Sequence, residues 1–238
     1  MTALVSSSHP GLSLAVSLRR IAALSIVAGY VEVIGFMDVG GIYPGIMTGN
    51  TVQLGLTLAK GQWARFSIVG LAVALFFLGG IISSLVKRHL RWPPAELLLM
   101  AAILLVASFV RLTPAERIVV ELPLLALAMA MQGETIAKFG GVSLQTIVVT
   151  NNMVKFSDAL VGRYLSRPNA SAPSRALPEL KEVLMPGLAW LGYSIGAGSG
   201  AIAAAMFRLP LLVPAIVLAL LVGDLSSSRQ DVAEGVVD

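Results

Sequence analysis

The chain has 238 residues, of which 56% are hydrophobic and 13% are charged, and its formal net charge at pH 7 is +4. Soluble domains carry about 25% charged residues, so the composition excludes a protein whose surface faces water throughout. Cysteine is absent, which excludes disulfides, thiolate catalysis and cysteine-ligated metals. A basic excess is typical of cytoplasmic loops in membrane proteins, so we expect a lipid bilayer as the partner and no nucleic acid.

Six apolar runs have the length, or nearly the length, of a membrane-spanning helix, which needs about 20 residues. In chain order they are Ile21–Val39, Phe66–Val86, Ala95–Val110, Ile118–Ala137, Val183–Phe207 and Leu209–Val222. Residues 1–20 are too polar for a cleaved signal sequence, so we expect a cytoplasmic tail there. Residues 224–238 are expected to form a second polar tail. The sequence thus predicts a single transmembrane domain over residues 21–223.

A motif at the end of the first run returns, degraded, before the fifth run. The first copy has Gly40-Gly41 followed by Thr48-Gly49-Asn50, and the second has Gly140-Gly141 followed by Thr150-Asn151-Asn152. In each copy the Gly-Gly pair ends an apolar run, a short β-rich stretch follows, and another helical pattern begins near the threonine. Two copies of an interrupted helix in a hydrophobic chain are typical of transporters with internal repeats.

We therefore predict an all-α membrane protein with about six transmembrane helices in two three-helix repeats, residues 21–112 and 116–223. Each repeat contains a broken half helix, so residues 42–47 and 142–149 are expected to be non-helical. We favour re-entrant broken segments, because three crossings per repeat give the second repeat the opposite orientation. Broken segments that cross the membrane completely are the alternative, and both versions satisfy the positive-inside rule.

Each broken segment offers a helix N-terminus at membrane depth, where irregular backbone is tolerated only if it is buried in protein or lines a wet cavity. Thr48 and Thr150 are predicted to begin the half helices and to cap them with their hydroxyl groups. The remaining N–H groups and the positive end of each helix dipole favour a small anionic or polar solute. The alternative is that the motif merely caps and packs a turn.

Polar residues near the two breaks form the predicted substrate-binding site, because charge at membrane depth is costly and marks function or pairing. For Asp38, Lys138, Lys155 and Asp158 we expect interfacial or structural pairs. Glu32 and Glu134 lie deeper, and Gln132 precedes its Gly-Gly pair by the same eight residues as Glu32. The predicted site comprises Glu32, Thr48, Gly49, Asn50, Gln132, Glu134, Thr150 and Asn152.

Glycines at four-residue spacing in the fifth run, Gly192, Gly196 and Gly200, predict a face for close helix packing. Gly79-Gly80 in the second run is expected to play the same part in the first repeat. Such small-residue faces also make oligomerisation a possibility to consider.

The segment from Gly29 to Gly55, with Met47-Thr48-Gly49-Asn50 at its centre, resembles the YoaK family of bacterial six-helix membrane proteins. The second copy keeps Gln132 and Thr150 but has Ala130, Gly133 and Asn151 where that family usually has Gly, Asn and Gly. The resemblance covers residues 20 to 223 and implies an integral protein of the bacterial inner membrane.

The sequence favours a small-solute transporter or permease in the inner (plasma) membrane, with both termini cytoplasmic. The alternative is a non-transporting membrane scaffold or assembly partner, which the small-residue faces and the lack of large soluble domains would suit. An intramembrane enzyme lacks support, because no Ser/His pair or His-rich set lies within the spans. We expect no cofactor and no metal.

Overall fold

The computed structural model describes residues 13–89, 94–135, 138–139, 142–165 and 177–234, and these residues are almost entirely helical. The helices are α1 (Leu14–Asp38), α2 (Met47–Ala59), α3 (Trp63–His89), α4 (Pro94–Val110), η1 (Pro114–Glu116), η2 (Arg117–Glu121), α5 (Leu122–Thr135), α6 (Val149–Leu160), η3 (Val161–Leu165), α7 (Leu180–Met206) and α8 (Leu212–Glu234). Two short strands, β1 (Lys138–Phe139) and β2 (Val142–Ser143), pair antiparallel with Lys138 opposite Ser143.

Three of these helices are long and apolar enough to cross a membrane: α1, residues Trp63–Val86 of α3, and α7. Apolar stretches of α4 and α8 are shorter. The predicted all-helical membrane character is confirmed at this level. The first residues of the fourth predicted run, from Ile118 to Glu121, belong to the π-helix η2, so this run is not one continuous α-helix.

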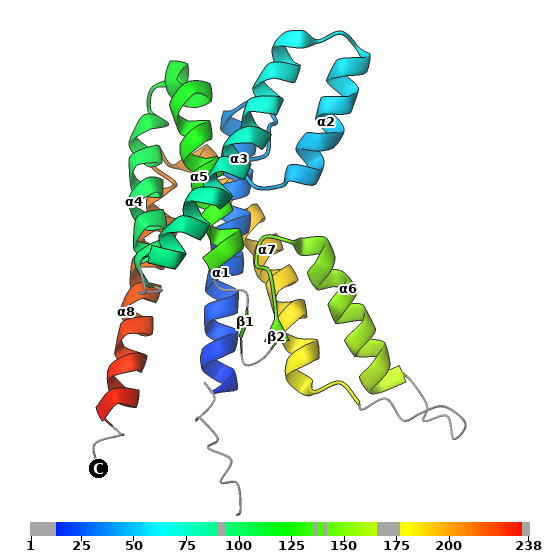
Figure 1. Cartoon of the computed structure of the whole chain (residues 1–238), viewed down its shortest axis with the longest axis vertical. Helices are drawn as coiled ribbons and strands as arrows, with labels where there is room; N and C mark the ends of the chain where they lie inside the picture. Colours follow the sequence, from blue (N-terminus) through cyan, green and yellow to red (C-terminus); the bar gives the residue numbers. More distant parts are fainter. Residues whose placement is uncertain (1–12, 90–93, 136–137, 140–141, 166–176, 235–238) are drawn as a thin grey trace, which may run out of the picture.

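The long helices pack in pairs that join distant parts of the chain. Helix α7 packs on α1, α3 on α5, and α4 on α8. The short helices cover their successors, α2 lying on α3 and α6 on α7. In Figure 1, α2 runs upward and α6 runs downward on the same side of the molecule, and both begin near its mid-height. Helix α3 is strongly inclined to the long axis.

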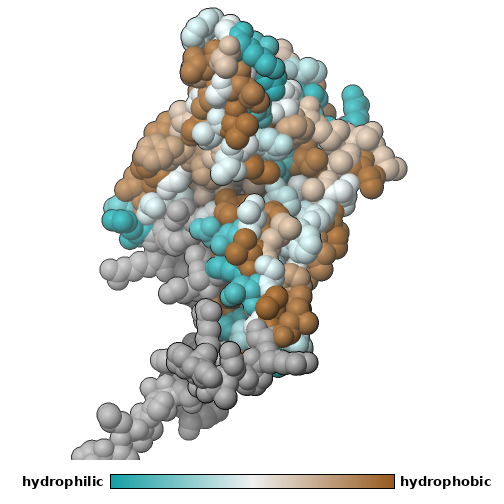
Figure 2. All heavy atoms as spheres, turned by 90° about the vertical axis from the view of Figure 1, so that its right-hand side faces the viewer, coloured by the Kyte–Doolittle hydropathy of each residue, from teal (hydrophilic) through white to brown (hydrophobic). Residues whose placement is uncertain are grey.

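Figure 2 faces the side that carries α2 and α6, and hydrophobic side chains cover much of it. Hydrophilic side chains gather at the upper end and over part of the lower half. Helix α2 contributes apolar side chains to this face: it exposes Val52 and Leu56 and buries Asn50 and Thr57. An apolar outer face with polar groups turned inward is the arrangement expected of a helix in lipid.

Glycines allow α7 to lie directly against α1, as the sequence predicts. A Cβ on Gly196 would overlap the carbonyl oxygen of Ile26, and one on Gly200 would lie 2.7 Å from the carbonyl oxygen of Tyr30. Gly79 plays the equivalent part between α3 and α5, where a Cβ would lie 2.9 Å from Ala130. Gly80 does not, because open space surrounds it.

Helix α1 ends at the first Gly-Gly pair because both glycines adopt positive φ, +68° at Gly40 and +82° at Gly41. The N–H of Gly41 donates to the carbonyl of Phe36 at 2.8 Å, which closes the last turn. The predicted role of this pair is confirmed. The second pair, Gly140-Gly141, lies outside the described residues.

Both short helices begin one residue earlier than predicted, at Met47 and Val149, so residues 47 and 149 are helical. The capping role assigned to Thr48 and Thr150 is wrong. The N-cap residues are Ile46 and Val148, and neither helix has a side-chain cap hydrogen bond. The predicted extended stretch is also displaced, since the paired strands end at Ser143 and Val149 already belongs to α6.

The terminal helices extend into the segments that were expected to be polar tails. Helix α1 begins at Leu14, where the Ser13 hydroxyl accepts a hydrogen bond from the N–H of Val16, and α8 continues to Glu234. Asp224 of α8 bonds Arg19 and Arg20 of α1, which allows charged residues to remain in both helices. Composition alone does not reveal this pairing across 204 residues of chain.

Candidate functional site at two helix breaks

The first break, residues 39–46, is held by a buried carboxylate from α1. Glu32 is only 3% exposed, and its Oε1 accepts hydrogen bonds from the N–H groups of Gly45 and Ile46, both at 3.1 Å. These N–H groups directly precede α2. A negative charge at a helix N-terminus is stabilised by the helix dipole. Glu32 therefore takes the place at the start of α2 that the sequence prediction gave to Thr48.

Gly45 lets Glu32 approach this closely. A Cβ at Gly45 would lie 2.6 Å from the Glu32 Oε2 and 2.8 Å from the methyl group of Met129 on α5. Any larger residue must displace one of these side chains. The first break is thus packed between α1 and α5, at the level of the molecule's own core.

Asn50 ties the break to the first turn of α2. Its Oδ1 accepts from the N–H of Tyr43 at 3.0 Å, and its Nδ2 donates to the carbonyl of the same residue at 2.7 Å. The Tyr43 ring packs on Phe36 with centroids 4.6 Å apart, and a Cβ at Gly49 would lie 2.9 Å from that ring. Asn50 and Gly49 therefore fix the path of the irregular backbone.

The second break, between α5 and α6, uses the same spacings. The Nδ2 of Asn152 donates to the carbonyl of Gln145 at 2.8 Å, seven residues earlier, as Asn50 does to Tyr43. The Nε2 of Gln132 lies 3.5 Å from the Thr146 hydroxyl, fourteen residues later, and Glu32 bonds Ile46 over the same distance in sequence. Both breaks are held by one side chain from the preceding helix and one asparagine from the following helix.

Gln132 also ties the second break to α1, because its Nε2 donates to the carbonyl of Leu24 at 2.6 Å. Leu24 precedes Glu32 by eight residues, which is about 12 Å along an α-helix. The structure thus places the predicted residues in two groups, Glu32 with Asn50 and Gln132 with Asn152. Both groups border α1, one farther along it than the other.

The remaining predicted residues lie elsewhere. Thr48 and Thr150 occupy the second positions of α2 and α6, and both are exposed. Glu134 belongs to α5, but its side chain lies outside the described part of the structure. The assignment of the whole set to substrate binding stays a prediction.

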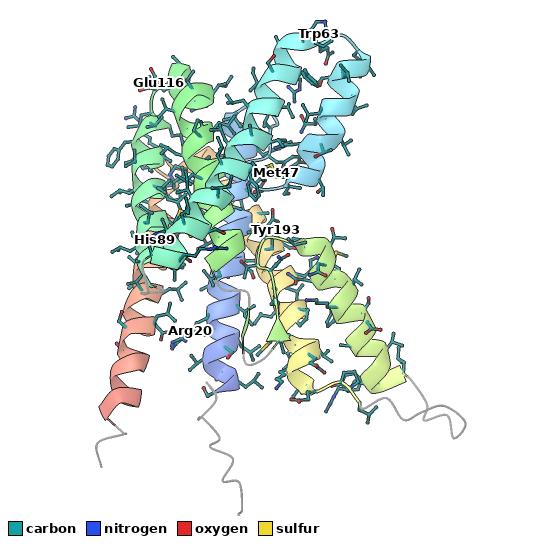
Figure 3. The ribbon with its side chains drawn as sticks, viewed as in Figure 1. Arg20, Met47, Trp63, His89, Glu116 and Tyr193 are labelled. Atoms are coloured by element: carbon teal, nitrogen blue, oxygen red, sulfur yellow. The ribbon has the colours of Figure 1, made fainter. Side chains whose placement is uncertain are left out.

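Three buried oxygen atoms at the breaks accept no hydrogen bond: Oε2 of Glu32, Oε1 of Gln132 and Oδ1 of Asn152. Buried polar atoms normally have a partner, so an unpaired one points to a ligand, a water molecule or strain. The Tyr193 side chain of α7 interacts electrostatically with Glu32 and Tyr43. Figure 3 labels Tyr193 on α7 and Met47 at the start of α2, both near mid-height in this view.

A separate ionic cluster fastens the end of α1. Asp38 accepts hydrogen bonds from Arg111 at 2.5 and 3.2 Å and pairs with Arg117 at 3.4 Å. Arg111 also donates to the carbonyl of Ala204 at the end of α7. The expectation that Asp38 forms a structural pair is confirmed. Arg117 also pairs with Glu121 at 4.0 Å, so the cluster balances two guanidinium groups with two carboxylates and holds the helix ends together.

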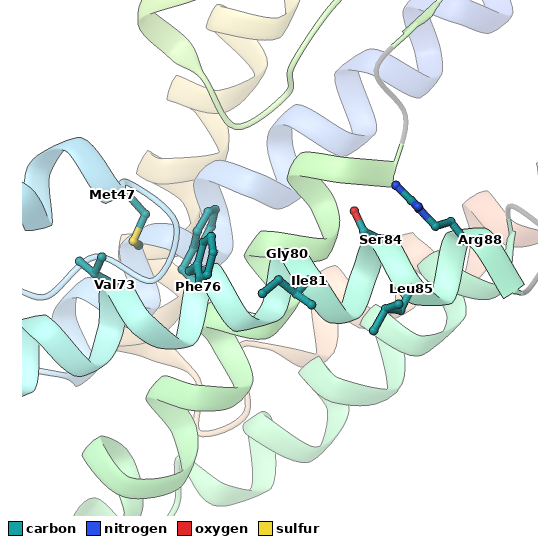
Figure 4. A pocket seen from close by; sticks show the side chains of 9 residues that line it. Met47, Val73, Phe76, Gly80, Ile81, Ser84, Leu85 and Arg88 are labelled. Carbon is teal, nitrogen blue, oxygen red and sulfur yellow. The ribbon is translucent and has the colours of Figure 1, made fainter.

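An apolar groove of about 590 Å³ runs along α3. Figure 4 shows Met47 of α2 at one end of the groove and Arg88 at the other, with Phe76, Gly80 and Ile81 between them. Apart from Ser84 and Arg88 the lining side chains are apolar, so hydrocarbon chains suit the groove better than a polar solute does. The open space around Gly80, which does not serve helix packing, contributes to this groove.

Comparison with known protein families gives a match that spans the helices described above. Residues 21–223, from α1 to α8, match the family model described as "Protein of unknown function (DUF1275)". The chain belongs to this family. It is also 28% identical over 184 residues to the UPF0700 transmembrane protein YoaK of Bacillus subtilis (strain 168), covering 73% of this chain and 78% of that protein. No solved structure matches. The predicted resemblance to the YoaK family is confirmed.

Several residues at the breaks of this family member were not predicted from sequence. Tyr43 and Gln145 were missed, although each lies seven residues before the repeated asparagine and an alignment anchored on Asn50 and Asn152 would have paired them. Gly45 carries no motif of its own. Tyr193 lies in α7 beyond any repeat of the motif, and only the packing of α7 on α1 brings it near Glu32.

Proposed function

We propose that this chain is a small-solute transporter or permease whose solute binds at the two helix breaks. The observation that carries the proposal is the set of unpaired, buried oxygen atoms beside interrupted helices inside a membrane protein. Irregular backbone at membrane depth is a recurring solute site in transporters, because free backbone groups there replace the solute's hydration shell. The matching spacings at the two breaks support an internal repeat with one break in each half.

We further propose that both breaks are re-entrant and that the chain crosses the membrane six times. The opposite courses of α2 and α6 in Figure 1 support two halves of inverted orientation. In this arrangement both termini lie in the cytoplasm, and the loops rich in Lys and Arg lie on the same side, in agreement with the positive-inside rule. The membrane would be the bacterial inner membrane.

The scaffold alternative loses its main support. It was motivated by small-residue helix faces, but Gly196 and Gly200 are covered by α1 within the same chain. That face is therefore not available to a partner protein.

Solute permeation can be tested by the swelling of proteoliposomes in gradients of formate, acetate, glycerol, urea and ammonium salts. We expect faster swelling than in protein-free liposomes for at least one of these solutes, and loss of the difference in Asn50→Leu. The matched control is Thr57→Val, because Thr57 is buried on the same helix but bonds only carbonyls of α2. Swelling equal to that of empty liposomes for every solute would contradict the proposal.

The topology can be tested by single cysteines, since the chain has none of its own. With a membrane-impermeant maleimide, Gln62→Cys should react from outside intact cells. His89→Cys and Leu177→Cys should react only after the membrane is opened. Reaction of Gln62→Cys and Leu177→Cys from the same side would support complete crossing by the broken segments instead.

A further inference from the structure

The charge of the solute can be inferred from which hydrogen-bonding groups at the breaks are already used. Helix N-termini attract anions, and for this reason the sequence favoured an anionic or polar solute. At the first break, however, the N–H groups of Gly45 and Ile46 already donate to Glu32. The protein supplies its own anion at the start of α2, and a second anion there would be repelled.

Among the buried side chains at the breaks, the hydrogen-bonding capacity that remains is of one kind. The amide nitrogen of Asn50 donates to the Tyr43 carbonyl and to the Met47 sulfur, so Asn50 has no donor left for a ligand. At the second break the amide nitrogens of Gln132 and Asn152 are bonded, and their oxygens are not. With Oε2 of Glu32, the unpaired buried side-chain atoms at the two breaks are all acceptors. Such atoms bind cations or hydrogen-bond donors.

An ionised Glu32 would also lack a counter-ion within the described residues. No ion pair involving Glu32 occurs there, and the described ion pairs of Arg20 and Arg111 are with Asp224 and Asp38. Tyr193 of α7 lies close enough to Glu32 to interact with it electrostatically, and a phenol side chain supplies no positive charge. From α5 the neighbour is Met129. A buried carboxylate without compensation is costly, so a bound positive charge would stabilise it.

We propose that the first break binds a small monovalent cation at Oε2 of Glu32, and that the transported solute is therefore positively charged. Na⁺, K⁺, ammonium and the proton share this chemistry. The sign of the solute rests on the proposed transport function, whereas the binding of a cation at Glu32 does not.

The test compares melting temperatures of the purified full chain in detergent at equal ionic strength. Replacing choline by Na⁺, K⁺ or ammonium should raise the melting temperature by about 2–4 °C when the cation is at several times its dissociation constant. Exchanging chloride for formate or acetate, with choline as the cation, should not raise it. A proton is tested separately, by the acidification of dye-loaded proteoliposomes under a membrane potential.

Variants locate the effect. Glu32→Gln keeps an oxygen for the N–H groups of Gly45 and Ile46 but removes the charge, so the cation effect should be lost. The matched control is Glu121→Gln, because Glu121 is also a fully buried carboxylate but lies beside Arg117. It should keep the effect. Tyr193→Phe gives a second test that leaves Glu32 in place, and it should weaken the cation effect.

The inference is overturned if anions stabilise the chain and cations do not, if Glu32→Gln keeps the cation effect, or if neither salts nor proton movement depend on Glu32. Cation binding without any solute flux would refute transport and leave the cation site standing. Flux of a neutral or anionic solute without a cation effect would refute this inference and leave transport standing.

Discussion

The two helix breaks share a framework but differ in charge. Each has an asparagine bonded to a carbonyl seven residues earlier and a long side chain reaching over from the preceding helix. At the first break that side chain is Glu32, which accepts from the backbone of its own break. At the second it is Gln132, which donates to Leu24 of α1. The first break thus gains a charge, and the second gains a tie to another helix.

At each break a glycine allows a close contact between the loop and the preceding helix, but the glycine lies in the loop at the first break and in the helix at the second. At the first break the loop residue is Gly45 and the helix residue is the larger Glu32. At the second the loop residue is Ile147 and the helix contributes Gly133, where a Cβ would lie 2.8 Å from Ile147. Close contact between helix and loop is therefore reached by opposite means. This difference suggests that the first break has space allotted to a carboxylate, and the second to apolar packing.

The largest effect should come from the asparagines. Asn50→Leu removes two hydrogen bonds to Tyr43 and should lower the free energy of unfolding by about 3–4 kcal/mol, because each unpaired buried group costs about 1–3 kcal/mol. Asn152→Leu removes one hydrogen bond and should cost about 1–2 kcal/mol. Unfolding in mixed detergent, followed by tryptophan fluorescence, measures both. Equal losses in the two variants would show that the second break depends on its asparagine as strongly as the first.

Replacing Gln132 by Glu and Glu32 by Gln should lower the free energy of unfolding by unequal amounts. Gln132→Glu places a carboxylate against the carbonyl of Leu24, so a donor is replaced by a repelled acceptor and the cost should be about 2–3 kcal/mol. Glu32→Gln keeps an acceptor for Gly45 and Ile46 and should cost less than about 1 kcal/mol. The same unfolding measurement decides this. A larger loss in Glu32→Gln would mean that its charge, and not only its oxygen, holds the start of α2.

Replacing the contact glycines should reduce stability less than the largest changes above. Gly45→Ala and Gly133→Ala should each destabilise the chain by about 1–2 kcal/mol, because the new methyl group overlaps Glu32 or Ile147. Gly55→Ala is the control, since open space surrounds Gly55 within α2. It should be neutral or stabilising by up to about 1 kcal/mol, as expected for Ala in a helix. If Gly45→Ala behaves like the control, the contact with Glu32 is looser than described.

Local patterns in the sequence predicted the interrupted helices, the end of the first run at Gly40-Gly41, the packing role of Gly196 and the pairing of Asp38. Each depends on neighbours in the chain or on a charge that must be paired in lipid. The capping of α2 was not predicted correctly, because a threonine near a helix start looks like a cap whether or not a carboxylate arrives from another helix. The approach of Tyr193 to Glu32 depends on the α1–α7 pairing across the whole chain, and no local signal reports it.

The contact of Asp224 with Arg19 and Arg20 brings the start of α1 and the body of α8 together at one end of the molecule. The packing of the helices therefore does not require that α1–α4 precede α5–α8 in the chain. A flexible linker from α8 to α1, with a new opening at Leu112 between α4 and α5, would encode α5–α8 before α1–α4. Such a circular permutant keeps every contact of both breaks, since neither break crosses the new opening.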